Sequence, residues 1–196
     1  MSDAAAVRIR PAATVVLLRD GADGLEVWLQ QRATTLAFAA GMYAFPGGAV
    51  DPDDSQTAVP NELALQHAQV WLDGDSALAA AHLAAAARET FEESGVRLDL
   101  TTLVPWARWL TPPGESRRFD ARFYIAPCPA RQAPRPLTGE VASGDWFVLR
   151  RAVEAYGAGS LPMWPPTIST LLELVPFDDV ASATLAAPER IEVVAG

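Results

Sequence analysis

The sequence predicts an α+β fold in which helices pack on a mixed β-sheet. Two β-rich runs around turn residues occupy 14–32, and an alanine-rich helix is predicted near 77–94. Strand-like and helix-like segments mix without strict alternation, which favours a mixed sheet over a fully parallel one. The chain has 196 residues, 50% of them hydrophobic, so we expect one domain spanning 1–196.

The first run, "TVVLLRDGADGLEVWLQQR", predicts a β-hairpin because its two Asp-Gly pairs favour tight turns. Residues 25–30 alternate Leu and Val with Glu, Trp and Gln, so one face of this strand should be buried. The segment "FPGGAVDPDD", residues 45–54, is rich in Gly and Pro, which predicts a shaped loop.

Two helices are predicted next. "NELALQHAQVWL", residues 61–72, is helical in composition, and "DGDS" interrupts it. Asp75 or Ser76 can cap a second helix from about Ala77 to Ser94, which is dense in Ala. Gly95 follows at a position where glycine commonly ends a helix.

Later segments supply the rest of the sheet and its cover. Strands are predicted for "LVPWARWL", "FDARFYIAP" and "DWFVLR", and the loop "TPPGESRR" joins the first two. Helices are predicted for "RAVEAYG" and "PPTISTLLELV", the second entered through prolines. The sequence from Asp178 onward favours neither helix nor strand.

Charge and cysteine content narrow the function classes. The net charge is −9 without a block of Lys or Arg, so duplex nucleic acid is not an expected partner. Small phosphorylated ligands fit if a metal ion bridges the like charges. No apolar run predicts a membrane span, and the first residues lack the apolar core of a signal peptide. Cys128 is the single cysteine, which fits a reducing cytoplasm.

Four charged residues crowd the end of the alanine-rich helix, in "RETFEESGV": Arg88, Glu89, Glu92 and Glu93. One helical turn separates Glu89 from the other glutamates, so all three can point to one side. Their position near a helix C-terminus opposes the macrodipole, so stability alone does not favour them. A divalent cation reverses their repulsion, and Mg²⁺ prefers oxygen ligands. The pattern predicts a metal site, with a solvated helix end as the alternative.

This stretch resembles the second half of the Nudix box, G-x5-E-x7-R-E-U-x-E-E-x-G-U, in which U is a bulky apolar residue. The matching positions are Arg88, Glu89, Glu92, Glu93, Gly95 and Val96. Gly48 resembles the opening glycine of the box, and Asp54 stands where the box has Glu. Residues 55–87 replace the usual short spacer, so we expect an insertion at about 55–80. The resemblance implies an α/β/α sandwich with a mixed sheet.

The segment "RATTLAFAAGMYAFPGGAVD" resembles the one that precedes the box in coenzyme A diphosphatases of this family. Arg32, Leu36, Gly41 and "FPGG" match that pattern. Ala33 replaces a Ser and Ala37 replaces an Arg, so two alternatives stay open. One is the same chemistry on ADP-ribose, NADH or a nucleoside triphosphate. The other is a Nudix-like domain that binds a nucleotide without cleaving it.

The resemblance implies a metal-dependent hydrolase of the diphosphate bond in nucleoside diphosphate-X compounds, with coenzyme A or acyl-CoA as the leading substrate. Glu89, Glu92 and Glu93 would bind Mg²⁺ or Mn²⁺, and the backbone of Gly47 or Gly48 would add a ligand. The implied partner is a small nucleotide, and homodimers are common in the family.

Residues outside the box complete the expected site. Glu140 is a candidate for the general base or a further metal ligand, and it joins Glu92, Glu93 and Arg88 as the expected catalytic set. The expected substrate-binding set combines the backbone of the two glycines with arginines that can bind phosphates: Arg32, Gly47, Gly48, Arg117 and Arg118. A solvated surface position is the alternative for Glu140, Arg117 and Arg118.

Several other residue types are expected to be structural. Asp54 would cap local structure or support the metal site. His67 and His82 have no His or Cys neighbours, so they should be structural or exposed. Tryptophans 106, 109 and 164 are expected in the core.

Overall fold

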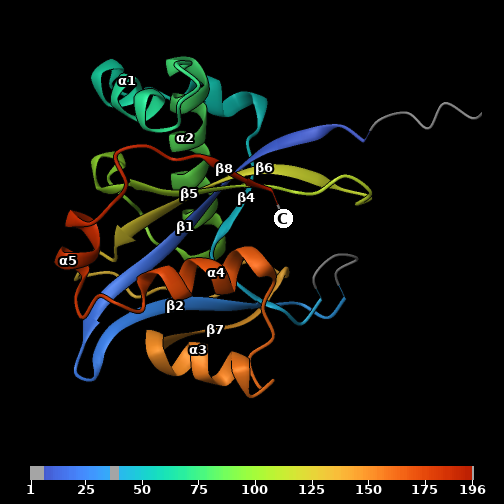
Figure 1. Ribbon diagram of the computed structural model, residues 1–196, viewed down its shortest axis with the longest axis vertical. Coiled ribbons are helices and arrows are strands. Elements are labelled where there is room, and N and C mark those ends of the chain that lie inside the picture. The colour runs from blue at the N-terminus through green and yellow to red at the C-terminus, as the bar shows by residue number, and fades with distance from the viewer. Residues whose placement is uncertain (1–6, 36–39, 196) are drawn as a thin grey trace, which may run out of the picture.

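The computed structural model describes residues 7–35 and 40–195. The fold is an α/β/α sandwich in which a mixed β-sheet lies between two helical layers (Figure 1). This arrangement confirms the expected α+β class. Leu36 and Ala37 of the family pattern lie outside the described residues. The strands are β1 (Ile9–Gly21), β2 (Gly24–Arg32), β3 (Tyr43–Ala44), β4 (Gly47–Ala49), β5 (Val104–Leu110), β6 (Arg118–Pro127), β7 (Val141–Val148) and β8 (Val193–Ala195).

Strand β1 lies inside the sheet, between β2 and β6. It runs antiparallel to β2, with Leu18 opposite Val27, and parallel to β6, with Val16 opposite Ile125. The order is β3-β2-β1-β6-β5-β8, while β4 pairs with β1 and β7 pairs with β2. Strands β5 and β6 are antiparallel and β5 and β8 are parallel, so the sheet is mixed.

The helices are the 3-10 turns η1 (Pro52–Gln56) and η2 (Leu100–Thr102), and α1 (Asn61–Val70), α2 (Ser76–Ser94), α3 (Leu149–Gly157), α4 (Pro165–Leu174) and α5 (Val180–Leu185). The Asp75 side chain caps α2 by accepting a hydrogen bond from the Leu78 N–H at 3.0 Å. Gly95 ends α2 with a φ of 75°, in the left-handed region that favours glycine. Both predicted ends of α2 are confirmed. No helix in the described ranges is long and apolar enough to cross a membrane.

Each face of the sheet has its own apolar core. Val16 and Leu18 of β1 face the core that packs against α3 and α4. Val15 and Leu17 face the other core, which packs against α1 and α2. Because β1 is buried on both faces, its sequence is a continuous apolar run and not an alternating one.

The element predictions are largely confirmed, with differences at boundaries. The hairpin of β1 and β2 is present, as are the predicted strands β5 and β6. Residues 47–49 of the expected loop form a short strand instead, because their backbone pairs with Ala12–Thr14 of β1. Strand β7 begins earlier than predicted, at Val141, and its predicted last residues, 149–150, start α3. The tail forms α5 and β8.

The segment between η1 and the carboxylates of α2 forms α1 and the first turns of α2, which lie together at one end of the molecule (Figure 1). His67 of α1 stacks on Tyr124 of β6, with ring centroids 5.8 Å apart. Asp73, between the two helices, forms an ion pair with the fully buried Arg122. His67 and His82 are both buried, which agrees with a structural role. Burial, reinforced by the positive charge of Arg122, lowers the pKa of each histidine to about 4.

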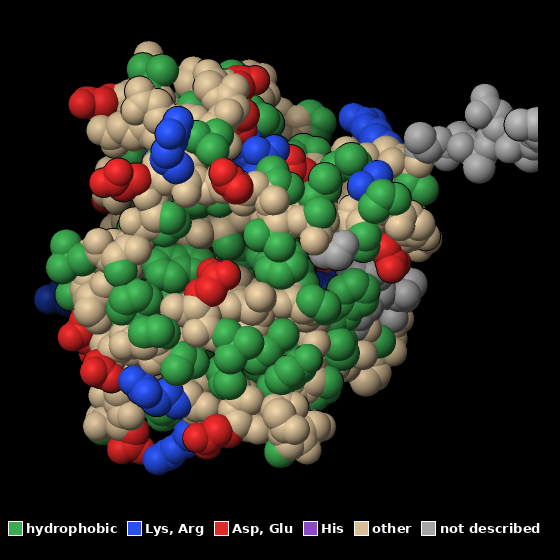
Figure 2. All heavy atoms as spheres, viewed as in Figure 1, with side chains coloured by type: hydrophobic (Ala, Val, Ile, Leu, Met, Phe, Trp, Pro, Cys, Tyr) green, Lys and Arg blue, Asp and Glu red, His purple; other side chains and the backbone are tan. Residues whose placement is uncertain are grey.

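Charged side chains are mixed on the face shown in Figure 2, where Arg side chains are scattered among Asp and Glu. Hydrophobic side chains occupy much of the surface between them on this face.

Candidate active site

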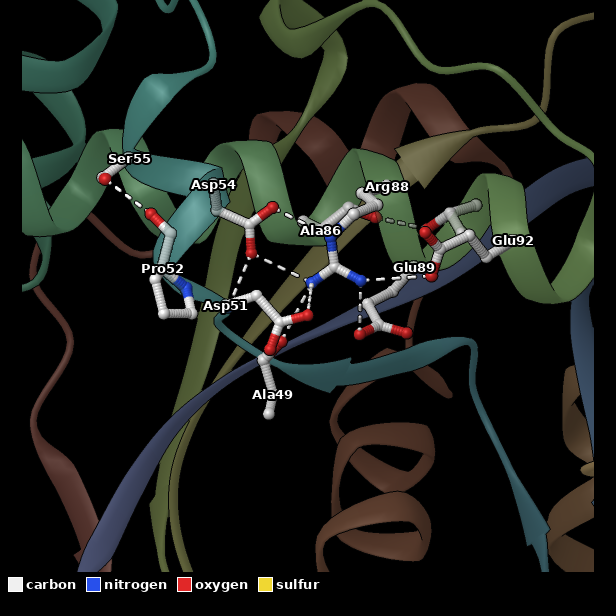
Figure 3. Close-up of polar contacts among 10 residues, drawn as sticks. Ala49, Asp51, Pro52, Asp54, Ser55, Ala86, Arg88, Glu89 and Glu92 are labelled. Atoms are coloured by element: carbon white, nitrogen blue, oxygen red, sulfur yellow. Dashed lines mark hydrogen bonds and ion pairs between the residues drawn. The ribbon is translucent and has the colours of Figure 1, made fainter.

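Arg88 lies at the centre of a carboxylate network near the end of α2 (Figure 3). Its guanidinium donates to both oxygens of Asp54, each at 2.9 Å, and to the Ala49 carbonyl at 3.0 Å. Its Nη1 donates to Glu89 at 2.9 Å and to Glu92 at 3.1 Å. The i, i+4 contact between Arg88 and Glu92 is therefore formed, and Arg88 links η1, β4 and α2.

Asp54 is the buried carboxylate of this network, with 3% of its surface exposed. Its Oδ2 also accepts a hydrogen bond from the Asp51 N–H at 2.8 Å. Burial acts to raise the pKa of Asp54, but the hydrogen bonds from Arg88 and Asp51 outweigh it and lower this pKa. The hydrogen bond to Asp54 in turn raises the pKa of Arg88. Both groups are ionised at neutral pH, and Asp54 caps the turn that holds Arg88.

Glu93 follows Glu92 in α2, and its side chain points into the protein. Its Oε2 accepts a hydrogen bond from the Gly47 N–H at 3.0 Å and another from the Gln30 side-chain amide. Only 7% of Glu93 is exposed. Burial raises the pKa of Glu93 to about 7, although both hydrogen bonds act to lower it. A nearby cation would stabilise the ionised form of this carboxylate.

Glu89 lies against the backbone of Gly48. The place that a Cβ on residue 48 would occupy is already filled by the Glu89 carboxylate. Gly47 is equally restricted, since a Cβ there would lie 2.5 Å from the Ala13 carbonyl oxygen. Burial raises the pKa of Glu89, although Arg88 opposes this. Gly48 thus lets the carboxylate helix approach β4 closely, and Gly47 lets β4 lie close to β1.

A cavity of about 780 Å³ lies beside β4 and the end of α2. It is lined by eight residues that the sequence pointed to, which come from distant parts of the chain: Arg32, Gly47, Gly48, Glu89, Glu92, Glu93, Arg117 and Glu140. Arg88 and Arg118 do not line it. Arg88 is engaged in the network described above, and Arg118 donates from Nε to the Thr111 carbonyl at 3.0 Å.

Aromatic residues of β5, β6 and the residue just before α4 also line the cavity: Trp109, Phe119, Phe123 and Trp164. Trp106 is in the core, as expected from its sequence context. Trp109 packs against the same core and also lines the cavity, whereas Trp164 differs from the expectation because it lines the cavity. Sequence reasoning also missed Gln30, which is 3% exposed and contacts Glu93 directly. The available signal was a polar residue in an otherwise apolar, buried stretch of β2.

The donor set of the cavity fits a hard divalent cation. Carboxylate oxygens and backbone groups are the ligands that Mg²⁺ and Mn²⁺ favour, and two of the three carboxylates are raised in pKa by burial. Within residues 7–35 and 40–195, no three His, Cys, Asp or Glu side chains are close enough together to hold a metal ion as they stand. Arg88 forms ion pairs with both Glu89 and Glu92 through Nη1.

Comparisons with known proteins agree with the fold and the motif. No family model matches the chain. It is 25% identical to the putative nudix hydrolase 7 of Caenorhabditis elegans over 188 residues, covering 78% of this chain and 57% of that protein. It is 32% identical to the acyl-coenzyme A diphosphatase NUDT19 of Xenopus laevis over 83 residues, covering 40% of this chain and 22% of that protein. The chain therefore spans little more than half of the first relative and less of the second.

The fold is also similar to the crystal structure of a NUDIX hydrolase from Alicyclobacillus acidocaldarius. The TM-score is 0.76 at 29% sequence identity, and the match covers 93% of this chain and 98% of that one.

Proposed function

Because the chain belongs to the Nudix hydrolase family, we propose that it is a metal-dependent pyrophosphohydrolase acting on the diphosphate bond of nucleoside diphosphate-X compounds. One observation carries the proposal: Glu89, Glu92 and Glu93 line the same cavity as Arg32 and Arg117. Carboxylates suit the cation that a diphosphate requires, and arginines suit the phosphate oxygens.

In this proposal the cavity residues have three roles in hydrolysis: metal binding, phosphate binding and proton transfer. Bound to the three glutamates, Mg²⁺ or Mn²⁺ would neutralise the diphosphate and lower the pKa of the attacking water. Gly47 and Gly48 line the cavity with backbone and no side chain, and Arg32 and Arg117 would hold the phosphate oxygens. Water adds to one phosphorus, the bridging P–O bond breaks, and the bridging oxygen leaves with the second phosphate. Glu140 is our candidate to accept the proton of that water.

Coenzyme A or an acyl-CoA is the leading substrate in this proposal. Support comes from Arg32, Gly41 and "FPGG", which match the coenzyme A diphosphatase pattern, and from the partial likeness to an acyl-coenzyme A diphosphatase. ADP-ribose, NADH and nucleoside triphosphates are the alternative substrates, because the carboxylates that carry the chemistry would be the same.

A nucleotide-binding domain without turnover is the competing function. Degenerate boxes are expected for such a domain, whereas this chain keeps Arg88 and all three glutamates. The intact set favours hydrolysis.

Product analysis with coenzyme A, ADP-ribose and NADH, each with Mn²⁺, Mg²⁺ or EDTA, tests the proposal. We expect metal-dependent release of 3′,5′-ADP and 4′-phosphopantetheine from coenzyme A. Turnover of only ADP-ribose or NADH would support the proposed reaction and reject coenzyme A as the substrate. Tight binding of a nucleotide without metal-dependent turnover would reject the reaction in favour of the binding domain.

A further inference from the structure

Gln30 and the Gly47 N–H hold the same oxygen of Glu93. Both donate to Oε2, from β2 and from β4 respectively. No hydrogen bond to Glu93 Oε1 is found among the described residues, and Glu93 lines the cavity. The carboxylate is thus fixed through one oxygen, and the other is left for a ligand.

The position of Gln30 follows from the strand. Side chains alternate along β2, so Gln30 lies on the same side of the sheet as Trp28, whose core packs against α2. Gln30 is 3% exposed, and among the described residues its side-chain amide has one hydrogen bond, to Glu93. A carboxylate accepts hydrogen bonds, so the amide nitrogen must face Glu93 when that group is ionised.

This orientation leaves the other end of the Gln30 amide without a protein partner. Gln30 Oε1 is buried and accepts no hydrogen bond from the described residues. A buried acceptor without a partner costs about 1–3 kcal/mol, so an apolar side chain would serve stability better here. Packing therefore does not explain the amide, but contact with Glu93 does.

We propose that Gln30 is a positioning residue for the divalent-cation site: its amide fixes Glu93 so that Oε1 is presented to the cation. The proposal rests on the function proposed above, in which Glu93 is a metal ligand. Groups that hydrogen-bond to a metal-binding side chain and orient it commonly contribute about 10- to 100-fold to metal affinity.

Mn²⁺ affinity of the apo protein, measured by calorimetry or by the EPR signal of free Mn²⁺, tests this role without turnover. We expect Gln30→Met, which keeps the size and removes the amide, to weaken Mn²⁺ binding by roughly 10- to 100-fold. Gln31→Met is the matched control. Gln31 is the next residue of β2, and its amide donates to the Gly41 carbonyl at 3.2 Å and not to Glu93.

The outcomes separate the two proposals. Unchanged Mn²⁺ affinity in folded Gln30→Met would overturn the positioning role, whether or not the wild-type protein hydrolyses a substrate. Absence of Mn²⁺ binding by the wild-type protein would overturn it as well. Mn²⁺ binding that depends on Gln30, without turnover of any substrate, would support the positioning role while contradicting the hydrolase.

Gln30→Asn is the second variant, to be used if Gln30→Met does not give the wild-type circular dichroism spectrum. Its amide is one methylene too short to keep the contact with Glu93, and we expect the same loss of Mn²⁺ affinity. Wild-type affinity in Gln30→Asn would then overturn the positioning role.

Discussion

Arg88 and Asp54 share two hydrogen bonds of 2.9 Å, although 34 positions separate them in the chain. This contact joins the two ends of the insertion that the sequence predicts, so that α1 and the first turns of α2 extend away without separating Gly48 from the carboxylates of α2. The insertion is therefore compatible with an intact carboxylate helix. From the length of the chain we propose that it forms one domain.

Asp54→Asn should destabilise the protein because it removes the charge from a buried, bidentate contact with Arg88. Loss of charged hydrogen bonds of this kind typically costs about 1.5–3 kcal/mol. Urea unfolding should show that decrease in the free energy of unfolding. Asp53→Asn is the control, since Asp53 is exposed and should change stability by less than about 0.5 kcal/mol. Equal stability of the two variants would contradict the closing role of Asp54.

Gly48→Ala should displace Glu89, because the Cβ would take the place of its carboxylate. We expect kcat to fall by about 10-fold or more, since small misplacements of reacting groups have effects of that size or larger. Gly157→Ala is the matched control, since no atom of the part of the chain that the structure describes lies within 4 Å of a Cβ there. Wild-type kcat in Gly48→Ala would show that Glu89 is not held in place by this contact.

Acid should destabilise the protein through His67 and His82. Both have a folded-state pKa of about 4, below the ordinary 6.5, because burial and Arg122 disfavour the charged form. The unfolded chain therefore takes up protons first, and stability is lost as pH falls from about 6.5 to about 4. At about pH 5.5 this loss is on the order of 1–1.5 kcal/mol per histidine.

Urea unfolding at pH 7.5 and pH 5.5 measures the effect. The double variant H67Q/H82Q should lose most of the difference between the two pH values, because the chain has no other histidine. The same pH dependence in the double variant would assign acid sensitivity to the carboxylates instead.

Glu93→Gln should inactivate the protein and leave it folded. Gln keeps the size of the side chain but is a far weaker ligand for a divalent cation, so we expect kcat to fall by roughly 100-fold or more. The thermal midpoint in EDTA should be unchanged or higher, because a buried carboxylate near Glu89 is replaced by a neutral group. Glu154→Gln on the exposed side of α3 is the control. A large loss of thermal stability in Glu93→Gln would assign Glu93 a structural role.

The sequence predicted the sheet, most helices and the carboxylate cluster for physical reasons that are local. The ends of α2 are an example, because an Asp cap and a left-handed glycine act within one turn of the chain. The strand at 47–49 was missed because only its pairing with β1, far along the chain, makes these glycines extended. The contact of Gln30 with Glu93 was missed for the same reason, since 63 positions separate the two residues. The cavity position of Trp109 and Trp164 depends on packing that no local pattern encodes.

Turnover of coenzyme A measured during a Mn²⁺ titration of the wild-type and Glu93→Gln proteins, with the thermal midpoint read on the same samples, tests the central claim most directly. We predict that turnover and the wild-type midpoint rise together as Mn²⁺ saturates one site, and that binding at 100 times the Kd adds about 2.7 kcal/mol of stability. In Glu93→Gln we predict that neither turnover nor the thermal midpoint rises with Mn²⁺. Stabilisation and turnover that are identical in the two proteins would contradict a catalytic metal site built on Glu93.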